Sequence, residues 1–310
     1  MKQLTSHILM VQPVAFRYNE ETAKNNFYQK ELGSLAGDEI QMRALKEFNE
    51  FVVKLEQNGV HVHVIRDTIS SDTPDSIFPN NWVSFHQDGR VALYPMFAKN
   101  RRMERRPAIL DNLRSKNFNI SSVVDFSMYE SEDVFLEGTG SMILDRDHRI
   151  CYAALSIRTD KEIALKFCSE FDYELVSFNA NQTHDGERLP IYHTNVMMCV
   201  ADEYVVICMD AIDDLAEQKM LIDCFEKTNK EIIEISEEQK QEFAGNMLQV
   251  RGNEPYLVMS TSAFKSLNEE QLKKIEKFNP IIHSELDTIQ ACGGGSARCM
   301  MAEVFLPLNS

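Results

Sequence analysis

The chain lacks the features that mark several large classes of protein. No apolar run approaches the ~20 residues needed to cross a bilayer, and residues 1–7 carry no signal-peptide pattern. Lys and Arg number 32 against 48 Asp and Glu, and the net charge of −16 repels nucleic-acid phosphates and anionic lipid. The seven cysteines are an odd number without a Cys-x-x-Cys pair, which argues against a disulfide framework or a zinc site. We therefore expect a cytoplasmic protein without nucleic-acid or membrane partners.

A motif recurs along the chain about every 50 residues. Each copy is a small or polar residue followed by a strand-like run, a polar turn and a second such run, and the copies lie at positions 81, 140, 195, 246 and 296. Repeats of this length are typical of propellers and solenoids. A helix-like stretch and a further strand lie between copies, and strand 7–11 would pair with the last unit to close a ring. No linker interrupts the series, so one α/β domain over 1–310 is expected.

The clearest helix signal covers residues 38–58. Its apolar positions recur at helical spacing, and Gly59 provides a stop. Asp38 and Gln41 have the spacing of a capping pair. The residues expected on the buried face are Met42, Leu45, Phe48, Val52 and Leu55.

Three motifs far apart in the sequence carry residues suited to thiol chemistry. Cys299 follows three glycines at 293–295, which permit a close approach of the backbone to a ligand. The adjacent Arg298 would favour the thiolate, the nucleophilic form of cysteine. Glu137 precedes a Gly-Thr-Gly stretch, and His193 opens an apolar run. A cysteine, a histidine and an acid are what a thiol hydrolase needs as nucleophile, proton shuttle and orienting group.

Together these features resemble the pentein superfamily of arginine deiminases and amidinotransferases. The resemblance rests on the five α/β units, the Gly-Gly-Gly-x-x-x-Cys run, the Glu-Gly-x-Gly segment and the histidine at a strand start, and it covers the whole chain. It implies a five-bladed α/β propeller with pseudo-fivefold symmetry. It also implies that Cys299 is the nucleophile, His193 the general acid and base, and Glu137 their partner acid. Neither a metal nor an organic cofactor is implied.

Four further positions follow from the same resemblance. Asn81 and Asn195 stand where deiminases carry two Asp that grip a guanidinium. Arg101, in an Arg-x-x-Glu stretch, and Arg158, in Ser-x-Arg-Thr, match arginines that bind the substrate carboxylate, although the adjacent Arg102 leaves the first register open. An amide lacks the carboxylate's charge and offers donors as well as an acceptor, so the exchange favours a neutral ureido group.

The sequence therefore predicts hydrolysis of a C–N bond in citrulline, giving ornithine, ammonia and carbon dioxide. The subgroup that it most resembles is the citrulline-utilisation hydrolases, often labelled amidinotransferases. The alternatives are an arginine-directed deiminase, dihydrolase or amidinotransferase, and a non-catalytic pentein that acts as a binding module. Cys299 could also be an ordinary buried strand cysteine. A homo-oligomer is compatible with this sequence, and a metal at His61 and His63 is disfavoured because no third ligand is evident.

Overall fold

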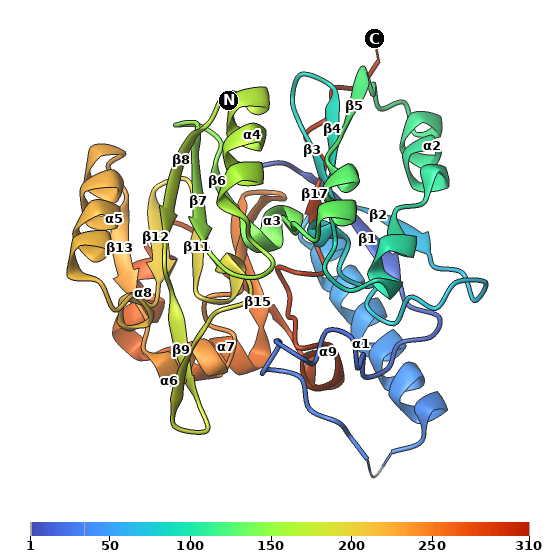
Figure 1. The fold of residues 1–310 in the computed structure, drawn as a ribbon, viewed down its shortest axis with the longest axis horizontal. Coiled ribbons are helices and arrows are strands. Elements are labelled where there is room, and N and C mark those ends of the chain that lie inside the picture. Colours follow the sequence, from blue (N-terminus) through green and yellow to red (C-terminus); the bar gives the residue numbers. More distant parts are fainter. Residues whose placement is uncertain (1, 34, 310) are drawn as a thin grey trace.

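The computed structural model describes residues 2–33 and 35–309 as a mixed α/β fold (Figure 1). Within these residues, five sheets have three strands each, and one small sheet has two. In four of the larger sheets the first two strands are antiparallel and the third is parallel to the second. Their strands are β3 (Val83–Phe85), β4 (Arg90–Leu93), β5 (Ser122–Asp125); β6 (Ile143–Asp145), β7 (Ile150–Ala154), β8 (Glu174–Phe178); β11 (Met198–Val200), β12 (Tyr204–Ile207), β13 (Glu231–Glu234); β14 (Leu248–Arg251), β15 (Pro255–Ser260), β16 (Ile281–Ser284).

The fifth sheet joins the two ends of the chain. It consists of β17 (Ala302–Glu303), β1 (His7–Gln12) and β2 (His61–Arg66), with β1 in the centre. β1 pairs antiparallel with β17 and parallel with β2, so this sheet repeats the strand directions of the other four. The predicted pairing of the opening strand with the last unit is confirmed. The two-stranded sheet is a hairpin of β9 (Asn181–His184) and β10 (Glu187–Pro190).

Helices lie outside the sheets and at their ends. The α-helices are α1 (Gly37–Gln57), α2 (Pro107–Ser115), α3 (Gly138–Ser141), α4 (Lys161–Phe171), α5 (Leu215–Lys227), α6 (Glu237–Gln241), α7 (Thr261–Ser266), α8 (Glu269–Glu276) and α9 (Asp287–Gly293). The 3-10 helices are η1 (Pro79–Asn81), η2 (Asn100–Glu104), η3 (Ser127–Glu132), η4 (Thr194–Val196) and η5 (Met209–Ala211). None of the described helices is long and apolar enough to cross a membrane.

The longest helix, α1, was predicted in place but not in every detail. Phe48, Val52 and Leu55 are buried as expected, and Gly59 follows the end with a φ of +83°. Met42 is 64% exposed, because the buried stripe runs through Ile40 and Ala44 instead. The capping pair is also wrong. Ala36 holds the N-cap position without a side-chain hydrogen bond. The side-chain amide of Gln41 instead bonds the backbone of the segment that follows β1.

The five repeated positions meet at one end of the sheets. A methyl group built on Gly140 would lie 2.4 Å from Nδ2 of Asn81 and 2.9 Å from the ring of His193. The amide of Asn246 donates to the carbonyl of Asn195 (2.9 Å) and accepts from the backbone N–H of Arg298 (3.0 Å). The repeat therefore brings residues from five distant parts of the sequence to one place.

Candidate active site

Cys299 lies where the five repeated positions meet, one turn after the glycines at the end of α9. Its side chain is almost fully buried, and its sulfur accepts hydrogen bonds from Nδ2 of Asn195 and Nδ2 of Asn246, both at 3.3 Å. Gly294 has a φ of +62°, and methyl groups built on Gly293 and Gly295 would press on the ring of Phe78. The glycine run thus packs tightly against its surroundings while two amide donors point at the sulfur.

The neighbouring Arg298 does not act as we expected. Its guanidinium donates to a carboxylate oxygen of Glu303 at 2.9 Å and to the carbonyl of Met301 at 2.8 Å. These acceptors hold the positive charge of the guanidinium beside β17. The polar groups that do contact the sulfur are the neutral amides of Asn195 and Asn246.

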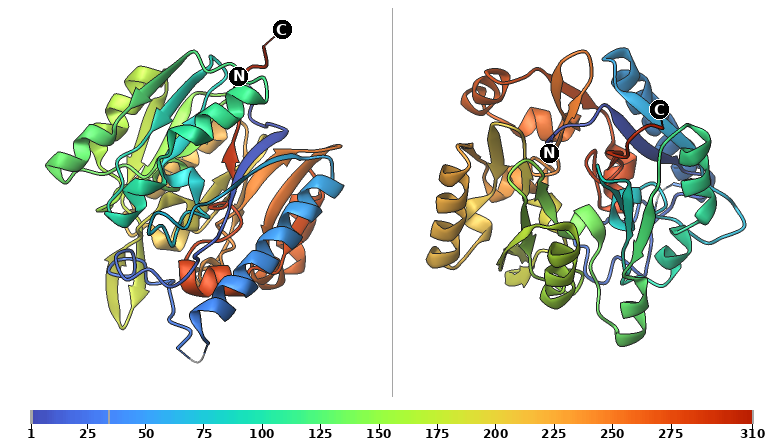
Figure 2. Two further views of the ribbon diagram at one scale, coloured as in Figure 1. Left: turned by 90° about the vertical axis from the view of Figure 1, so that its right-hand side faces the viewer. Right: turned by 90° about the horizontal axis from the view of Figure 1, so that it is seen from above.

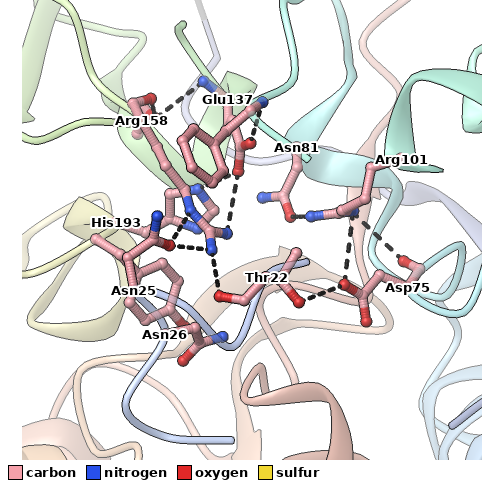
Figure 3. A network of polar contacts seen from close by, with 12 residues as sticks. Thr22, Asn25, Asn26, Asp75, Asn81, Arg101, Glu137, Arg158 and His193 are labelled. Atoms are coloured by element: carbon pink, nitrogen blue, oxygen red, sulfur yellow. Dashed lines mark hydrogen bonds and ion pairs between the residues drawn. The ribbon is translucent and has the colours of Figure 1, made fainter. Parts of the chain in front are cut away.

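Glu137 and His193 form a buried pair, and they directly precede α3 and η4 (Figure 3). Oε2 of Glu137 is 2.7 Å from Nε2 of His193, and the guanidinium of Arg158 is 3.5 Å from the same oxygen. The other oxygen, Oε1, accepts the backbone N–H of Phe97 at 2.9 Å. Three donors thus converge on one carboxylate.

The pKa values of this pair reflect burial and charge together. Burial lowers the pKa of His193 to about 4, and the Glu137 carboxylate opposes this only in part. For Glu137, burial by itself would raise the pKa. The guanidinium of Arg158 and the hydrogen bond from His193 outweigh burial and lower the pKa to about 2. The resting pair is a neutral imidazole beside an ionised carboxylate.

Arg101, rather than Arg102, faces the site. Its Nε and Nη2 atoms donate to the two oxygens of Glu104 at 2.8 and 3.0 Å, and Nη1 donates to Oδ1 of Asn81 at 2.8 Å. Nη2 also reaches the carbonyl of Phe78. Arg102 turns away and donates to the carbonyl of Met96. This resolves the register of the Arg-x-x-Glu stretch.

The orientation of the two amides follows from their partners. An arginine can only donate, so the bond from Arg101 fixes Oδ1 of Asn81 and directs Nδ2 elsewhere. Among the described residues, this buried Nδ2 has no acceptor. Asn195 is the reverse, because its Nδ2 faces the sulfur of Cys299 and its buried Oδ1 has no donor in the described part of the chain. These two amides therefore offer one free donor and one free acceptor.

Several residues that were not predicted from the sequence also belong to the candidate site. Asp75 accepts bonds from Asn19 (2.7 Å) and Thr22 (3.1 Å) through Oδ2, while its Oδ1 has no partner among the described residues. Burial raises the pKa of Asp75, against the effect of Arg101. Thr22 and Asn26 belong to the segment after β1, which had no periodic pattern to reveal it. A signal did exist for Asn246, which holds the same place in the repeat as Asn81.

The cavity between these residues is nearly filled by side chains. It has a volume of about 10 Å³ and is lined by Thr22, Asn26, Asp75, Phe78, Asn81, Arg101, Arg158, Tyr192, His193, the glycines 293–295 and Cys299. A water molecule needs about 10–15 Å³ of such space, so an amino acid could enter only after a wall has moved. A larger hollow of about 680 Å³ lies elsewhere, beside residues 2–7 and the C-terminal segment 304–307.

The seven predicted site residues are therefore gathered in one place. Cys299, His193, Asn81, Arg101 and Arg158 line the cavity. Glu137 and Asn195 stand directly behind it, bonded to His193 and Cys299.

His61 and His63, at which a metal site was disfavoured, lie beside a third histidine, His7. Nε2 of His63 lies 3.1 Å from Nδ1 of His7, whose ring stacks on His61. Burial lowers the pKa of His63 to about 4. In residues 2–33 and 35–309, no group of three or more His, Cys, Asp or Glu side chains is arranged to hold a metal ion.

Comparison with known proteins gives one match to a family. The family model described as "N,N dimethylarginine dimethylhydrolase, eukaryotic" matches residues 12–306. Comparison with curated proteins gave no match.

Several solved structures have a similar fold. The apo structure of ArgZ, an arginine dihydrolase from the ornithine-ammonia cycle in Cyanobacteria, has a TM-score of 0.76 at 18% identity; the match covers 98% of this chain and 41% of that one. AgrE in ternary complex with ornithine and NAD+ has a TM-score of 0.73 at 19% identity, covering 98% and 40%. A dimethylarginine dimethylaminohydrolase variant, as an adduct with S-methyl-L-thiocitrulline, has a TM-score of 0.62 at 16% identity, covering 96% and 99%. The chain thus spans about two fifths of the first two proteins.

Proposed function

Because the chain belongs to the N,N dimethylarginine dimethylhydrolase family, we propose that it hydrolyses the guanidino or ureido group of a free amino acid. The family is one of pentein enzymes that act on non-peptide C–N bonds, and its description names a hydrolase, so the label amidinotransferase fits only loosely. Our proposed substrate is arginine, carried through a ureido stage to ornithine. Citrulline supplied directly is the second candidate, and the free donor of Asn81 favours it.

The observation that carries the proposal is the grouping of a thiol, a neutral imidazole and an ionised carboxylate. The Glu137 carboxylate only accepts, so Nε2 of His193 carries a proton and Nδ1 is free to take one. Nδ1 would remove the thiol proton of Cys299, and the sulfur would attack the central carbon of the substrate group. The protonated imidazole would then give this proton to the departing ammonia.

The second half of the reaction reverses these roles. Water would attack the carbon bound to sulfur, and His193 would accept a proton from that water. The C–S bond would break and return the thiol; at the ureido stage the product is a carbamate, which would lose carbon dioxide to leave ornithine. Amide N–H groups near the sulfur, those of Asn195 and Asn246, would stabilise negative charge on sulfur or on the developing oxyanion.

The amide pair is the reason to propose a ureido stage. A ureido group carries a carbonyl oxygen as well as N–H donors, whereas a guanidinium carries donors alone. The free Nδ2 of Asn81 would bond the carbonyl oxygen, and the free Oδ1 of Asn195 would accept an N–H. Glu137 remains as a carboxylate near the site, which suits the positive charge of the guanidino stage. ArgZ, similar in fold, is an arginine dihydrolase, and this supports both stages.

The charged ends of the amino acid would meet Arg158 and Asp75. We expected both Arg101 and Arg158 to hold the carboxylate. Both oxygens of the buried Glu104 carboxylate hold Arg101, which leaves it little reason to bind a second carboxylate, so we now assign it to orienting Asn81. Arg158 would bind the α-carboxylate, and the free Oδ1 of Asp75 would bind the α-ammonium.

We also propose that the five sheets are the blades of one propeller domain. The repeated positions meet at a common end, and the colours in the view from above follow one another around the molecule, which supports this arrangement (Figure 2). Location in the cytoplasm stays a prediction.

Product analysis tests the proposal directly. Purified protein would receive arginine, citrulline, agmatine or dimethylarginine, and ammonia and the amino-acid products would be identified. We expect ornithine from arginine with citrulline as an intermediate, and ornithine from citrulline. Ornithine from citrulline alone would select the second candidate, and release of citrulline as the final product would refute the ureido stage.

Cys299→Ala separates an enzyme from a binding module. We expect turnover to fall by at least about 10³-fold, because the covalent route is lost, while the melting temperature changes little. Cys292→Ala, seven residues earlier and also buried, is the matched control and should retain activity. Unchanged turnover in Cys299→Ala would refute the nucleophile assignment.

A further inference from the structure

The segment of residues 19–30, here called the strap, lies between β1 and α1, and its Thr22 and Asn26 line the cavity (Figure 3). Its contact with Arg158 uses two of the three guanidinium nitrogens, Nε and Nη2. Nε donates to Oδ1 of Asn25 at 2.8 Å, and Nη2 donates to the same oxygen and to the carbonyl of Thr22 at 2.8 Å. A single amide oxygen thus accepts two converging bonds from the Nε–Nη2 edge of the guanidinium, an edge that a carboxylate would bind with its two oxygens.

The strap also contacts Asp75, and there it supplies hydrogen-bond donors, whereas it supplies acceptors to Arg158. The Asn19 amide and the Thr22 hydroxyl both donate to Oδ2 of Asp75, at 2.7 and 3.1 Å. Donors on a carboxylate are what an ammonium group provides. The strap therefore presents an acceptor to Arg158 and donors to Asp75, which is the pattern of an α-amino acid head.

We propose that Asn25 is a specificity-determining residue that occupies the position of the substrate α-carboxylate and is displaced by it. Asn19 and Thr22 would likewise stand in for the α-ammonium. This inference rests on the proposed assignment of Arg158 and Asp75 to the amino-acid head. It makes the strap a competitor of the substrate at both ends of the head.

Two observations make the competition selective. The cavity under the closed strap holds about 10 Å³, so binding requires the strap to move. A carboxylate binds Arg158 better than a neutral amide does, because both partners are then charged. A compound with a guanidino group but no α-carboxylate, such as agmatine, brings nothing that can displace Asn25. The strap would thus select free α-amino acids.

Opposite changes at Asn25 test the idea against a merely structural role. Asn25→Ala removes the competing acceptor, and we expect the KM for the amino-acid substrate to fall on the order of tenfold while kcat is unchanged. Asn25→Asp adds a charge that Arg158 holds more firmly, so the KM should rise. Lys24→Ala, an exposed neighbour in the strap, is the control and should change neither constant. A KM that rises in Asn25→Ala, or that moves the same way in both variants, would overturn the proposal.

A second measurement needs no turnover. Hydrogen exchange of the strap would be followed in the wild-type protein with saturating L-norvaline, which has an amino-acid head and no reacting group, or with agmatine. We expect L-norvaline to speed exchange in residues 19–30, leaving α5 unchanged, and agmatine, which keeps the amine but has no carboxylate to displace Asn25, to have a smaller effect. Unchanged or slower strap exchange with L-norvaline would refute the inference. Faster exchange in a protein that hydrolyses none of the four compounds would keep the inference and reject the proposed function.

Discussion

Oε2 of Glu137 lies 2.7 Å from Nε2 of His193, and both residues are at most 2% exposed. The bond fixes which imidazole nitrogen carries the proton, because an ionised carboxylate offers no hydrogen. It also sets the plane of the ring beside Gly140. The pair is therefore arranged so that the free nitrogen, Nδ1, is a base.

The lowered pKa of His193 gives a pH prediction. The imidazole must be neutral to accept the thiol proton, and burial lowers its pKa to about 4 against 6.5 for the ordinary group. We expect kcat/KM to stay level from pH 8 to below pH 6 and to fall only as the pH approaches 4. A rate profile in overlapping buffers checks this, and an acid limb centred near pH 6.5 would contradict it.

The same pair links folding to pH. A histidine whose pKa is lower in the folded state stabilises the fold fully above pH 6.5, and this contribution is lost as the pH falls through about 4. The lowered pKa of Glu137 acts in the same direction, from pH 4.5 down to about 2. Both shifts make the protein less stable in acid, in a range where activity would also fall.

The two site asparagines give a prediction about specificity. Asn81→Asp with Asn195→Asp replaces one free donor and one free acceptor by carboxylate oxygens, which suit a guanidinium and repel a ureido carbonyl. We expect the ratio of kcat/KM for arginine to that for citrulline to rise by roughly 10–100-fold. The exposed Asn119→Asp is the control, and an unchanged ratio would show that these amides do not read the substrate.

Gly140 gives a test of packing at the site. An added methyl group would lie 2.4 Å from Nδ2 of Asn81 and 2.9 Å from the His193 ring, closer than real contacts allow. We expect Gly140→Ala to lower kcat by at least about tenfold, since a small misplacement of reacting groups is costly. Gly33→Ala, where a methyl group would meet nothing within 4 Å, is the matched control. Equal activities of the two variants would show that Gly140 has no positioning role.

The sequence predicted the parts of the fold that repeat. Each copy carries its own alternation and turn, so the repeated strand pairs and the pairing of the opening strand with the last unit could be predicted. The face of α1 was less certain, because Met42 and Ile40 are both apolar and only packing against the sheet selects one of them. The site followed from the same repeat, since equivalent positions of successive units meet at one end.

The strap and its partners could not be predicted in this way. Asn19, Thr22 and Asn25 lie in a segment without helical or strand periodicity, and their bonds reach Asp75 and Arg158, more than 50 positions away. Such contacts are fixed by the folded arrangement and leave no local pattern. Arg298 was misjudged for a related reason, because adjacency to Cys299 does not say which way its side chain points.

The buried ion pair of Lys230 and Asp145 gives a prediction about stability. Nζ of Lys230 is 3.2 Å from Oδ2 of Asp145 and donates to the carbonyls of Ala201 and Asp202, and both charged side chains are 0% exposed. The pair joins the end of β6 to the start of β13, which belong to different sheets.

Lys230→Met would leave the carboxylate buried without its cation, and we expect a loss of about 3–5 kcal/mol in the free energy of unfolding by urea. Lys219→Met, which breaks a solvent-exposed pair with Asp223, should leave the urea midpoint nearly unchanged. A loss in Lys230→Met as small as in this control would mean that the pair does not join the two sheets.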